Sequence, residues 1–134
     1  MPNSRDDFTK TTKQIAAGRV GYRCSFPQCT VATIGASFES GRAVSTTGVA
    51  AHICAAAAGG KRYDPQMTEE ERKSVDNCIW MCQTHARLID TDEVTYTVDK
   101  LREWKKEAEI AASKQLADMR FLIIIFVKMV KTYL

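Results

Sequence analysis

The chain has 134 residues, the size of one domain, which leaves no room for a second regulatory domain beside it. With 45% hydrophobic and 26% charged residues, the composition is that of an ordinary globular protein and excludes a disordered one. The net charge of +3 permits nucleic acid as a partner but does not require it.

The cysteines and the N-terminus indicate a cytoplasmic protein. The first residues are polar and contain no apolar segment typical of a signal peptide, and the five cysteines are an odd number. In a reducing compartment, clustered cysteines are read as metal ligands before disulfides. The apolar segment 121–127 is too short to cross a bilayer of ~30 Å. We therefore expect this segment to form a buried helix or strand, or an oligomer contact, and not a membrane span.

The first half of the chain predicts a helix, a cysteine knuckle and a strand. Residues 6–17 have helix-forming composition, and Gly18 or Gly21 would end the helix. Residues 30–47 are small and polar, which predicts an irregular loop or a weak hairpin. Residues 48–53 predict a strand. Its alternation puts one set of side chains on one face and another on the opposite face: Val49, Ala51 and Ile53 against Ala50 and His52.

The second half predicts two short strands and three helices. A helix over residues 67–76 would begin with a capping box of Thr68 and Glu71. A buried strand over residues 78–81 leads into a helix that starts at Cys82. Residues 93–97 predict another short strand. Thr97 then caps a long helix, whose apolar positions are spaced by three and four: Val98, Leu101, Trp104, Ala108, Ala111 and Ala112.

Two pairs of potential metal ligands stand about fifty residues apart. Cys24 and Cys29 have the spacing C-x4-C, and Cys82 and His85 have the spacing C-x2-H. Together they supply the four nitrogen and sulfur ligands of a tetrahedral structural zinc site. The alternative is a set of unrelated buried cysteines and a core histidine. Cys78 lies too far along its extended strand to share the ion with Cys82 and is assigned to the core.

His52 and Asn77 lie outside this zinc set. A strand histidine, followed by an asparagine that opens the next strand and then by a helix, describes a ββα unit. A histidine with a pKa near its ordinary value of about 6.5 can accept a proton from water. The asparagine amide could hold the intervening loop and orient the imidazole through a backbone carbonyl. Taken alone, His52 would more often be a satisfied core histidine.

Five segments in order resemble a bacterial HNH endonuclease domain, which has a ββα-metal fold: CSFPQC, AAHICAAAAGGKRYD, MTEEER, NCIWMCQTHARLID and YTVDKLREWKKEAE. The resemblance covers residues 21–109 and is particularly close to nuclease domains that anti-phage systems couple to a cyclic-oligonucleotide sensor. It implies metal-dependent cleavage of double-stranded DNA, with His52 as general base and Asn77 as the second letter of the motif. The four predicted zinc ligands fall where that family places its structural zinc.

The third letter departs from this pattern. Many HNH domains have a zinc cysteine followed by a metal-binding histidine, and these positions are His85 and Ala86 here. The residue before His52 is Ala51, where many relatives carry a metal ligand. Either His85 serves the catalytic cation and the zinc set is incomplete, or another side chain replaces the missing ligand. Asp90, one helical turn beyond Ala86, is the candidate, and its alternative role is a solvated carboxylate at a helix end.

Basic residues near these motifs are candidates for DNA contacts. Lys61, Arg62 and Arg87 are the first choice, with further contributions from Arg72, Lys73 and the basic face of the last helix. Contacts of this kind bind phosphates and do not read bases, which predicts sequence-tolerant cutting. The alternative is a solvated surface of mixed charge.

The predicted fold is α+β, with a zinc-stapled ββα-metal (HNH) core between an N-terminal helix and a long C-terminal helix. Residues 1–20 form a helical lead-in, 21–118 the nuclease domain, and 119–134 an apolar tail. The predicted function is a DNA endonuclease of anti-phage defence that uses a structural Zn²⁺ and a catalytic Mg²⁺ or Mn²⁺. A homo-oligomer or a regulatory partner would control it. The alternative is a non-catalytic zinc module that binds nucleic acid or a protein partner.

Overall fold

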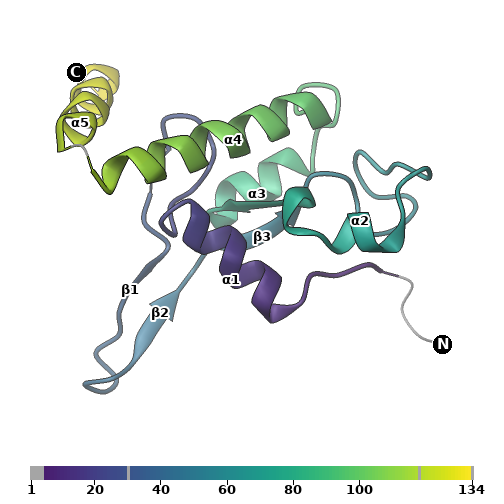
Figure 1. Cartoon of the computed structure of the whole chain (residues 1–134), viewed down its shortest axis with the longest axis horizontal. Coiled ribbons are helices and arrows are strands. Elements are labelled where there is room, and N and C mark those ends of the chain that lie inside the picture. Colours follow the sequence, from purple (N-terminus) through teal and green to yellow (C-terminus); the bar gives the residue numbers. More distant parts are fainter. Residues whose placement is uncertain (1–4, 30, 118, 134) are drawn as a thin grey trace.

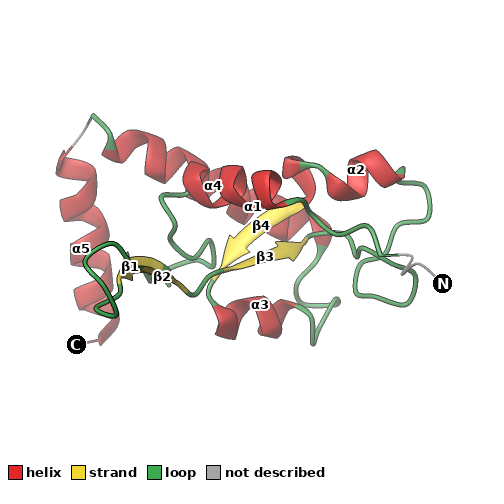
Figure 2. Cartoon of the chain, turned by 90° about the horizontal axis from the view of Figure 1, so that it is seen from below, coloured by secondary structure: helices red, strands yellow, loops and turns green. Residues whose placement is uncertain are grey.

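Two short antiparallel strands lie at the centre of the structure, a computed structural model that describes residues 5–29, 31–117 and 119–133, with the backbone alone for 119–122. β3 (Val49–His52) pairs with β4 (Cys78–Met81), and His52 lies opposite Cys78. α1 (Lys10–Arg19) covers one face of this sheet and α3 (Gln83–Ile89) the other (Figure 2). The mixed α+β architecture agrees with the prediction.

The alternation predicted for the first strand sorts its side chains between the two sides of the sheet. Ala51 and Ile53 pack with Ile79 and Met81 of β4 on the α3 side, whereas Ala50 packs toward α1. The Trp80 ring fills the space above Gly48, where a Cβ atom would lie only 2.2 Å from the Trp80 Cζ2 atom. Glycine is therefore the residue that lets this ring pack against the start of the strand.

A second, smaller sheet projects from the body of the molecule (Figure 1). β1 (Ile34–Ala36) and β2 (Val44–Thr46) pair as an antiparallel hairpin, the more ordered of the two alternatives expected for residues 30–47. All six strand residues are exposed. The hairpin thus extends away from the core and leaves both of its faces to solvent.

Two of the predicted helices have different boundaries in the structure. The first helix begins at Lys10, four residues late, because the Thr9 hydroxyl caps it by accepting from the Thr12 amide at 3.2 Å. The predicted helix 67–76 is divided into α2 (Glu69–Lys73), which has the expected capping box, and a 3-10 turn η1 (Val75–Asn77). Ser74 is extended between them.

Residues 93–97 form a turn and not the predicted strand. The Asp92 carboxylate accepts hydrogen bonds from the backbone amides of Val94 at 3.0 Å and Thr95 at 2.9 Å. A side chain that binds the backbone in this way competes with strand pairing. Thr97 then caps α4 (Val98–Gln115), as predicted.

The principal core lies between the sheet, α3 and α4. Its fully buried members are Ile53, Ile79, Met81, Ile89 and Leu101. Burial of each such side chain contributes roughly 1.5–3 kcal/mol to folding. α4 also packs Ala108 against the second side of the sheet, near Trp80. The long helix therefore contacts apolar residues on both sides of the sheet.

The apolar tail forms a helix, α5 (Met119–Tyr133), beside the C-terminal end of α4 (Figure 1). Ile125 and Met129 line a cavity shared with the cysteine knuckle and Trp104, but Ile123, Phe126 and Tyr133 are mostly exposed. The expectation of a buried helix is therefore wrong for much of its surface. None of the described helices combines the length and the apolar character that a bilayer crossing requires.

Candidate metal centre and histidine cavity

The two predicted ligand pairs come together in one cluster, the Cys3His cluster, which consists of Cys24, Cys29, Cys82 and His85. Their ligand atoms all lie within 4.8 Å of one another. The His85 Nδ1 atom is 3.3 Å from the Cys82 Sγ atom and 3.5 Å from the Cys24 Sγ atom. Ligands of a tetrahedral zinc ion with ordinary bond lengths are separated by roughly 3.5–3.8 Å. The group could therefore hold a metal ion such as zinc.

The local backbone explains how the knuckle aims both thiols at one point. Gln28 adopts a left-handed conformation with φ of 67°, and the Cys29 amide donates to the Phe26 carbonyl at 3.1 Å. The Ser25 amide donates to the Trp80 carbonyl at 3.0 Å, which fixes the knuckle to β4. Cys82 is the N-cap residue of α3, so His85 follows in the first turn of that helix.

Phe26 supports the cluster, although sequence reasoning did not select it. Its ring stacks on the His85 imidazole, with centroids 3.9 Å apart and an angle of 4° between the planes. The only available signal was its position between the two knuckle cysteines. Burial raises the pKa of the Cys24 thiol to about 12, so binding of an ion has to displace a proton from this group.

His52 ends β3, and the N-terminal segment contacts its imidazole on one face and at one ring nitrogen. Its Nε2 atom lies 2.9 Å from the Asp6 carbonyl oxygen, and the Phe8 ring stacks on it with centroids 3.8 Å apart. Because a carbonyl oxygen only accepts hydrogen bonds, Nε2 carries the proton and Nδ1 is the nitrogen able to accept one. Burial lowers the pKa of His52, which keeps the imidazole neutral at cellular pH.

Asn77 closes the chain segment that leaves β3. Its side-chain oxygen accepts from the Cys54 amide at 2.9 Å, and its Nδ2 atom donates to the carbonyls of Cys54 and Arg72 at 3.0 Å each. Asn77 is only 3% exposed, and these three hydrogen bonds satisfy its buried amide group. The carbonyl that receives the imidazole belongs to Asp6, so Asn77 does not orient His52 by the expected route.

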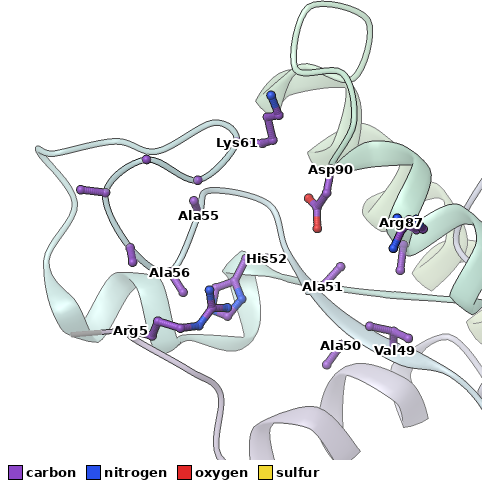
Figure 3. Close-up of a pocket in the computed structure, with 15 residues that line it drawn as sticks. Arg5, Val49, Ala50, Ala51, His52, Ala55, Ala56, Lys61, Arg87 and Asp90 are labelled. Atoms are coloured by element: carbon purple, nitrogen blue, oxygen red, sulfur yellow. The ribbon is translucent and has the colours of Figure 1, made fainter. Parts of the chain in front are cut away.

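A cavity of about 660 Å³ runs along the outer edge of β3, between the loop 55–61 and α3. Figure 3 shows the His52 imidazole and the Asp90 carboxylate on its walls, with Arg5, Lys61 and Arg87 around them. Ala51 and Ala86, the two departures from the HNH pattern, also line the cavity. Their methyl groups supply no ligand at either position.

Asp90 reaches this cavity from the end of α3, where it is the C-cap residue. Its side chain is 60% exposed and lies 3.1 Å from the Arg62 guanidinium. Among the described residues, the Cys3His cluster is the one group of three or more potential ligands close enough to hold an ion. Asp90 and His52 alone therefore do not form a cage for a second cation. Asp90 would suit only an ion that takes its other ligands from water and substrate oxygens.

The prediction that Arg62 contacts DNA is wrong. Its side chain is 2% exposed, and its guanidinium donates to the carbonyls of Ile53 at 2.7 Å, Ile89 at 2.6 Å and Tyr96 at 3.3 Å. Together with the Asp90 contact, these bonds engage all three guanidinium nitrogens and four of the five N–H donors. Arg62 therefore joins the segment after β3 to the end of α3 and holds the Asp90 carboxylate beside the cavity.

Two other basic residues expected at a DNA surface are also engaged in the fold. Lys105 is 9% exposed and donates to the Cys78 carbonyl at 2.8 Å. The Arg72 side chain is 12% exposed, pairs with Asp6 at 3.3 Å and lies over the Tyr63 ring. Lys61 and Arg87, by contrast, are exposed. Neither forms an ion pair with any residue that the structure describes.

No protein-family model matches the chain, and no curated protein matches it. The functional argument therefore depends on the geometry of the Cys3His cluster and of the His52 cavity.

Proposed function

We propose that this protein is an HNH-type endonuclease, stabilised by a structural zinc ion in the Cys3His cluster, that hydrolyses phosphodiester bonds of double-stranded DNA. The observation that carries the proposal is the state of His52. Its imidazole is neutral, carries its proton on Nε2 and lies on the wall of an open cavity with Asp90 and three basic side chains.

In this proposal His52 is the general base of hydrolysis. The Nδ1 atom takes a proton from a water molecule, while Nε2 keeps its own proton and donates it in the hydrogen bond to the Asp6 carbonyl. The resulting hydroxide attacks phosphorus, a P–O bond forms, and the bond to the leaving oxygen breaks. Asp90 would contribute one ligand to a divalent cation that keeps water and phosphate ligands. Such a cation neutralises charge on the phosphate in the transition state.

The exposed cations around the cavity suit a phosphate backbone. Lys61 and Arg87 line it, and a neighbouring cavity of about 510 Å³ contains Lys10 and Lys13 of α1. The two cavities share Val49 and Ala50, so the basic side chains border one continuous surface. These residues contact phosphates and carry no base-reading arrangement, which supports sequence-tolerant cutting.

A sequence-tolerant nuclease requires control in a cell. The resemblance to nuclease domains of anti-phage systems favours an effector that a sensor or a second copy switches on. The exposed apolar residues of α5 are the first place to look for such a contact.

A specific observation favours the alternative of a non-catalytic zinc module. Ala51 and Ala86 present methyl groups to the cavity, and the one carboxylate there contacts the Arg62 guanidinium. A site that had lost its cation would retain this pattern. The alternative predicts binding of nucleic acid or of a protein partner without cleavage.

Plasmid nicking separates the two functions. Supercoiled plasmid is incubated with Mg²⁺ or Mn²⁺ and with the wild type, His52→Ala or Asp90→Ala, each checked for about one zinc per chain. We expect the wild type to nick and both variants to lose activity while keeping zinc. Intact plasmid with the wild type, at high protein concentration and with either metal, refutes the nuclease. Full activity of Asp90→Ala would remove Asp90 from the cation site.

A further inference from the structure

Residues 5–8, the N-terminal strap, lie beside the end of β3 without regular secondary structure and are fixed at three points. The Asp6 amide donates to the Ala56 carbonyl at 2.9 Å, and the Asp6 carboxylate pairs with Arg72 at 3.3 Å. Phe8 is 6% exposed and packs with Ala16 and Cys78. A segment held by a backbone bond, an ion pair and a core side chain has a defined position.

Among the described residues, the hydrogen-bond partner and the ring-stacking partner of the His52 imidazole both belong to this strap. The Asp6 carbonyl receives Nε2–H at 2.9 Å, and the Phe8 ring stacks on the imidazole at 3.8 Å with 11° between the planes. Arg5 lies farther along the strap on the cavity wall (Figure 3). The strand that carries His52 fixes its Cα atom, but the strap specifies the plane of the ring and which nitrogen is protonated.

We infer that the N-terminal strap is the positioning device of His52: Phe8 fixes the plane of its ring and the Asp6 carbonyl selects the Nε2–H tautomer. A neutral imidazole exists in two tautomers, and only this one leaves Nδ1 free to accept a proton. The consequence for catalysis rests on the proposed function. The consequence for the imidazole itself does not, so the two can be tested separately.

The matched variants follow from the contacts. Phe8→Ala removes the stacked ring, whereas Phe8→Tyr keeps it. Asp6→Ala removes the ion pair that holds the strap to Arg72. Asp7→Ala removes the same charge one residue later, from a carboxylate whose ion pair is with the exposed Arg5. Asp7→Ala is therefore the control for Asp6→Ala, and Phe8→Tyr is the control for Phe8→Ala.

The direct measurement is ¹⁵N NMR of the imidazole nitrogens in the zinc-loaded protein. The chain has two histidines, and a His52→Gln spectrum identifies the signals of His52. We expect a single Nε2–H tautomer in the wild type, in Phe8→Tyr and in Asp7→Ala. In Phe8→Ala and Asp6→Ala the two His52 nitrogen shifts should move toward each other, as tautomers exchange.

Kinetics give the second readout. If the protein nicks plasmid, Phe8→Ala should lower kcat by on the order of 10- to 100-fold, because a small misplacement of a catalytic group has effects of that size. KM should change by less than about twofold, since the phosphate contacts come from other residues. Phe8→Tyr should restore kcat.

A fixed Nε2–H tautomer in both Phe8→Ala and Asp6→Ala would overturn the inference. If Phe8→Ala does not fold, as judged by amide dispersion and zinc content, the comparison of Asp6→Ala with Asp7→Ala decides it. Equal tautomer exchange in those two variants also counts against the strap. A wild type that leaves plasmid intact refutes the proposed nuclease, while the NMR result still decides what positions His52.

Discussion

The Cys3His cluster and the His52 cavity are both built on α3, yet the chain supplies them with very different numbers of ligands. The cluster takes Cys82 and His85 from the start of the helix and completes its set with the two thiols of the knuckle. The cavity takes Ala86, Arg87 and the C-cap residue Asp90 from the rest of the helix, and among these Asp90 alone has a side chain of a metal-ligating type. Successive turns of one helix thus face two sites of different chemistry.

The difference reflects what each site would do with an ion. A structural ion is closed off by four protein ligands and contributes its binding free energy to folding. A cation that acts on a phosphate has to leave positions for water and for the substrate. Few ligands in the His52 cavity are therefore expected of a working site, and cleavage is the property that separates it from a lost one.

Removal of one cluster ligand should have the largest effect on the molecule. Cys24→Ser is expected to lose both the zinc ion and the folded state. Binding of a structural zinc contributes on the order of 10 kcal/mol, which is comparable to the whole stability of a domain. Zinc per chain and amide dispersion measure the two losses. Cys54→Ser, a buried thiol outside the cluster, is the control and should keep its zinc. About one zinc per chain in Cys24→Ser would remove Cys24 from the ligand set.

Arg62→Met tests whether the Arg62 side chain stabilises the fold or contacts the substrate. The substitution leaves the carbonyls of Ile53 and Ile89 without their buried donor. It should lower the free energy of unfolding by roughly 2–5 kcal/mol, since each unsatisfied buried group costs about 1–3 kcal/mol. Urea denaturation measures this loss. Lys61→Met, at the exposed neighbouring position, should change stability by less than about 0.5 kcal/mol. If the two variants had equal free energies of unfolding, Arg62 would not stabilise the fold and would again be a candidate for DNA contact.

Arg62 also shows where sequence reasoning stops. The cysteine spacings predicted the cluster because four such ligands in two pairs suit very few purposes other than a metal. The alternation around His52 predicted the central strand because side chains of a strand must face two sides. A basic residue in a loop carries no comparable local signal. Arg62 is buried because carbonyls from three distant segments converge on it, and its backbone has a φ of 60°.

The N-terminal strap was missed for a related reason. Composition alone predicts one helix over residues 6–17, whereas Thr9 caps a helix that begins at Lys10. The predicted helix therefore includes Asp6 and Phe8, the two residues that contact His52. The contact between Asp6 and His52 joins positions 46 residues apart, a relation that periodicity does not report. Thr9, a residue type that often caps helices, is the signal in the sequence that the helix begins after Phe8.

The pH dependence of stability should reveal the lowered pKa of His52. Burial is the main cause that lowers the pKa of His52, so the unfolded chain binds a proton at this residue at a higher pH than the folded chain does. The contribution of His52 to stability is therefore fully present above pH 6.5, its unfolded value, and is lost as the pH falls through the folded pKa. Urea unfolding of the zinc-loaded wild type, compared with His52→Gln below pH 6.5, measures the difference. Identical pH profiles for the two proteins would show that the pKa of His52 is unshifted.

Lys61→Ala and Arg87→Ala should have the smallest effects, and these effects should be confined to the affinity for DNA. Both side chains are exposed on the cavity and have no ion pair among the described residues, so their loss removes nothing from the core. Each variant should weaken duplex binding severalfold and lower the slope of log affinity against log salt by about 1, as expected for one phosphate contact. Fluorescence anisotropy with a non-cleaved duplex at several salt concentrations gives both quantities. Lys100→Ala, an exposed lysine of α4 away from the cavity, should leave the slope unchanged. If all three variants had the same slope as the wild type, the DNA would have to lie on a different face, and the His52 cavity would lose its link to a phosphate backbone.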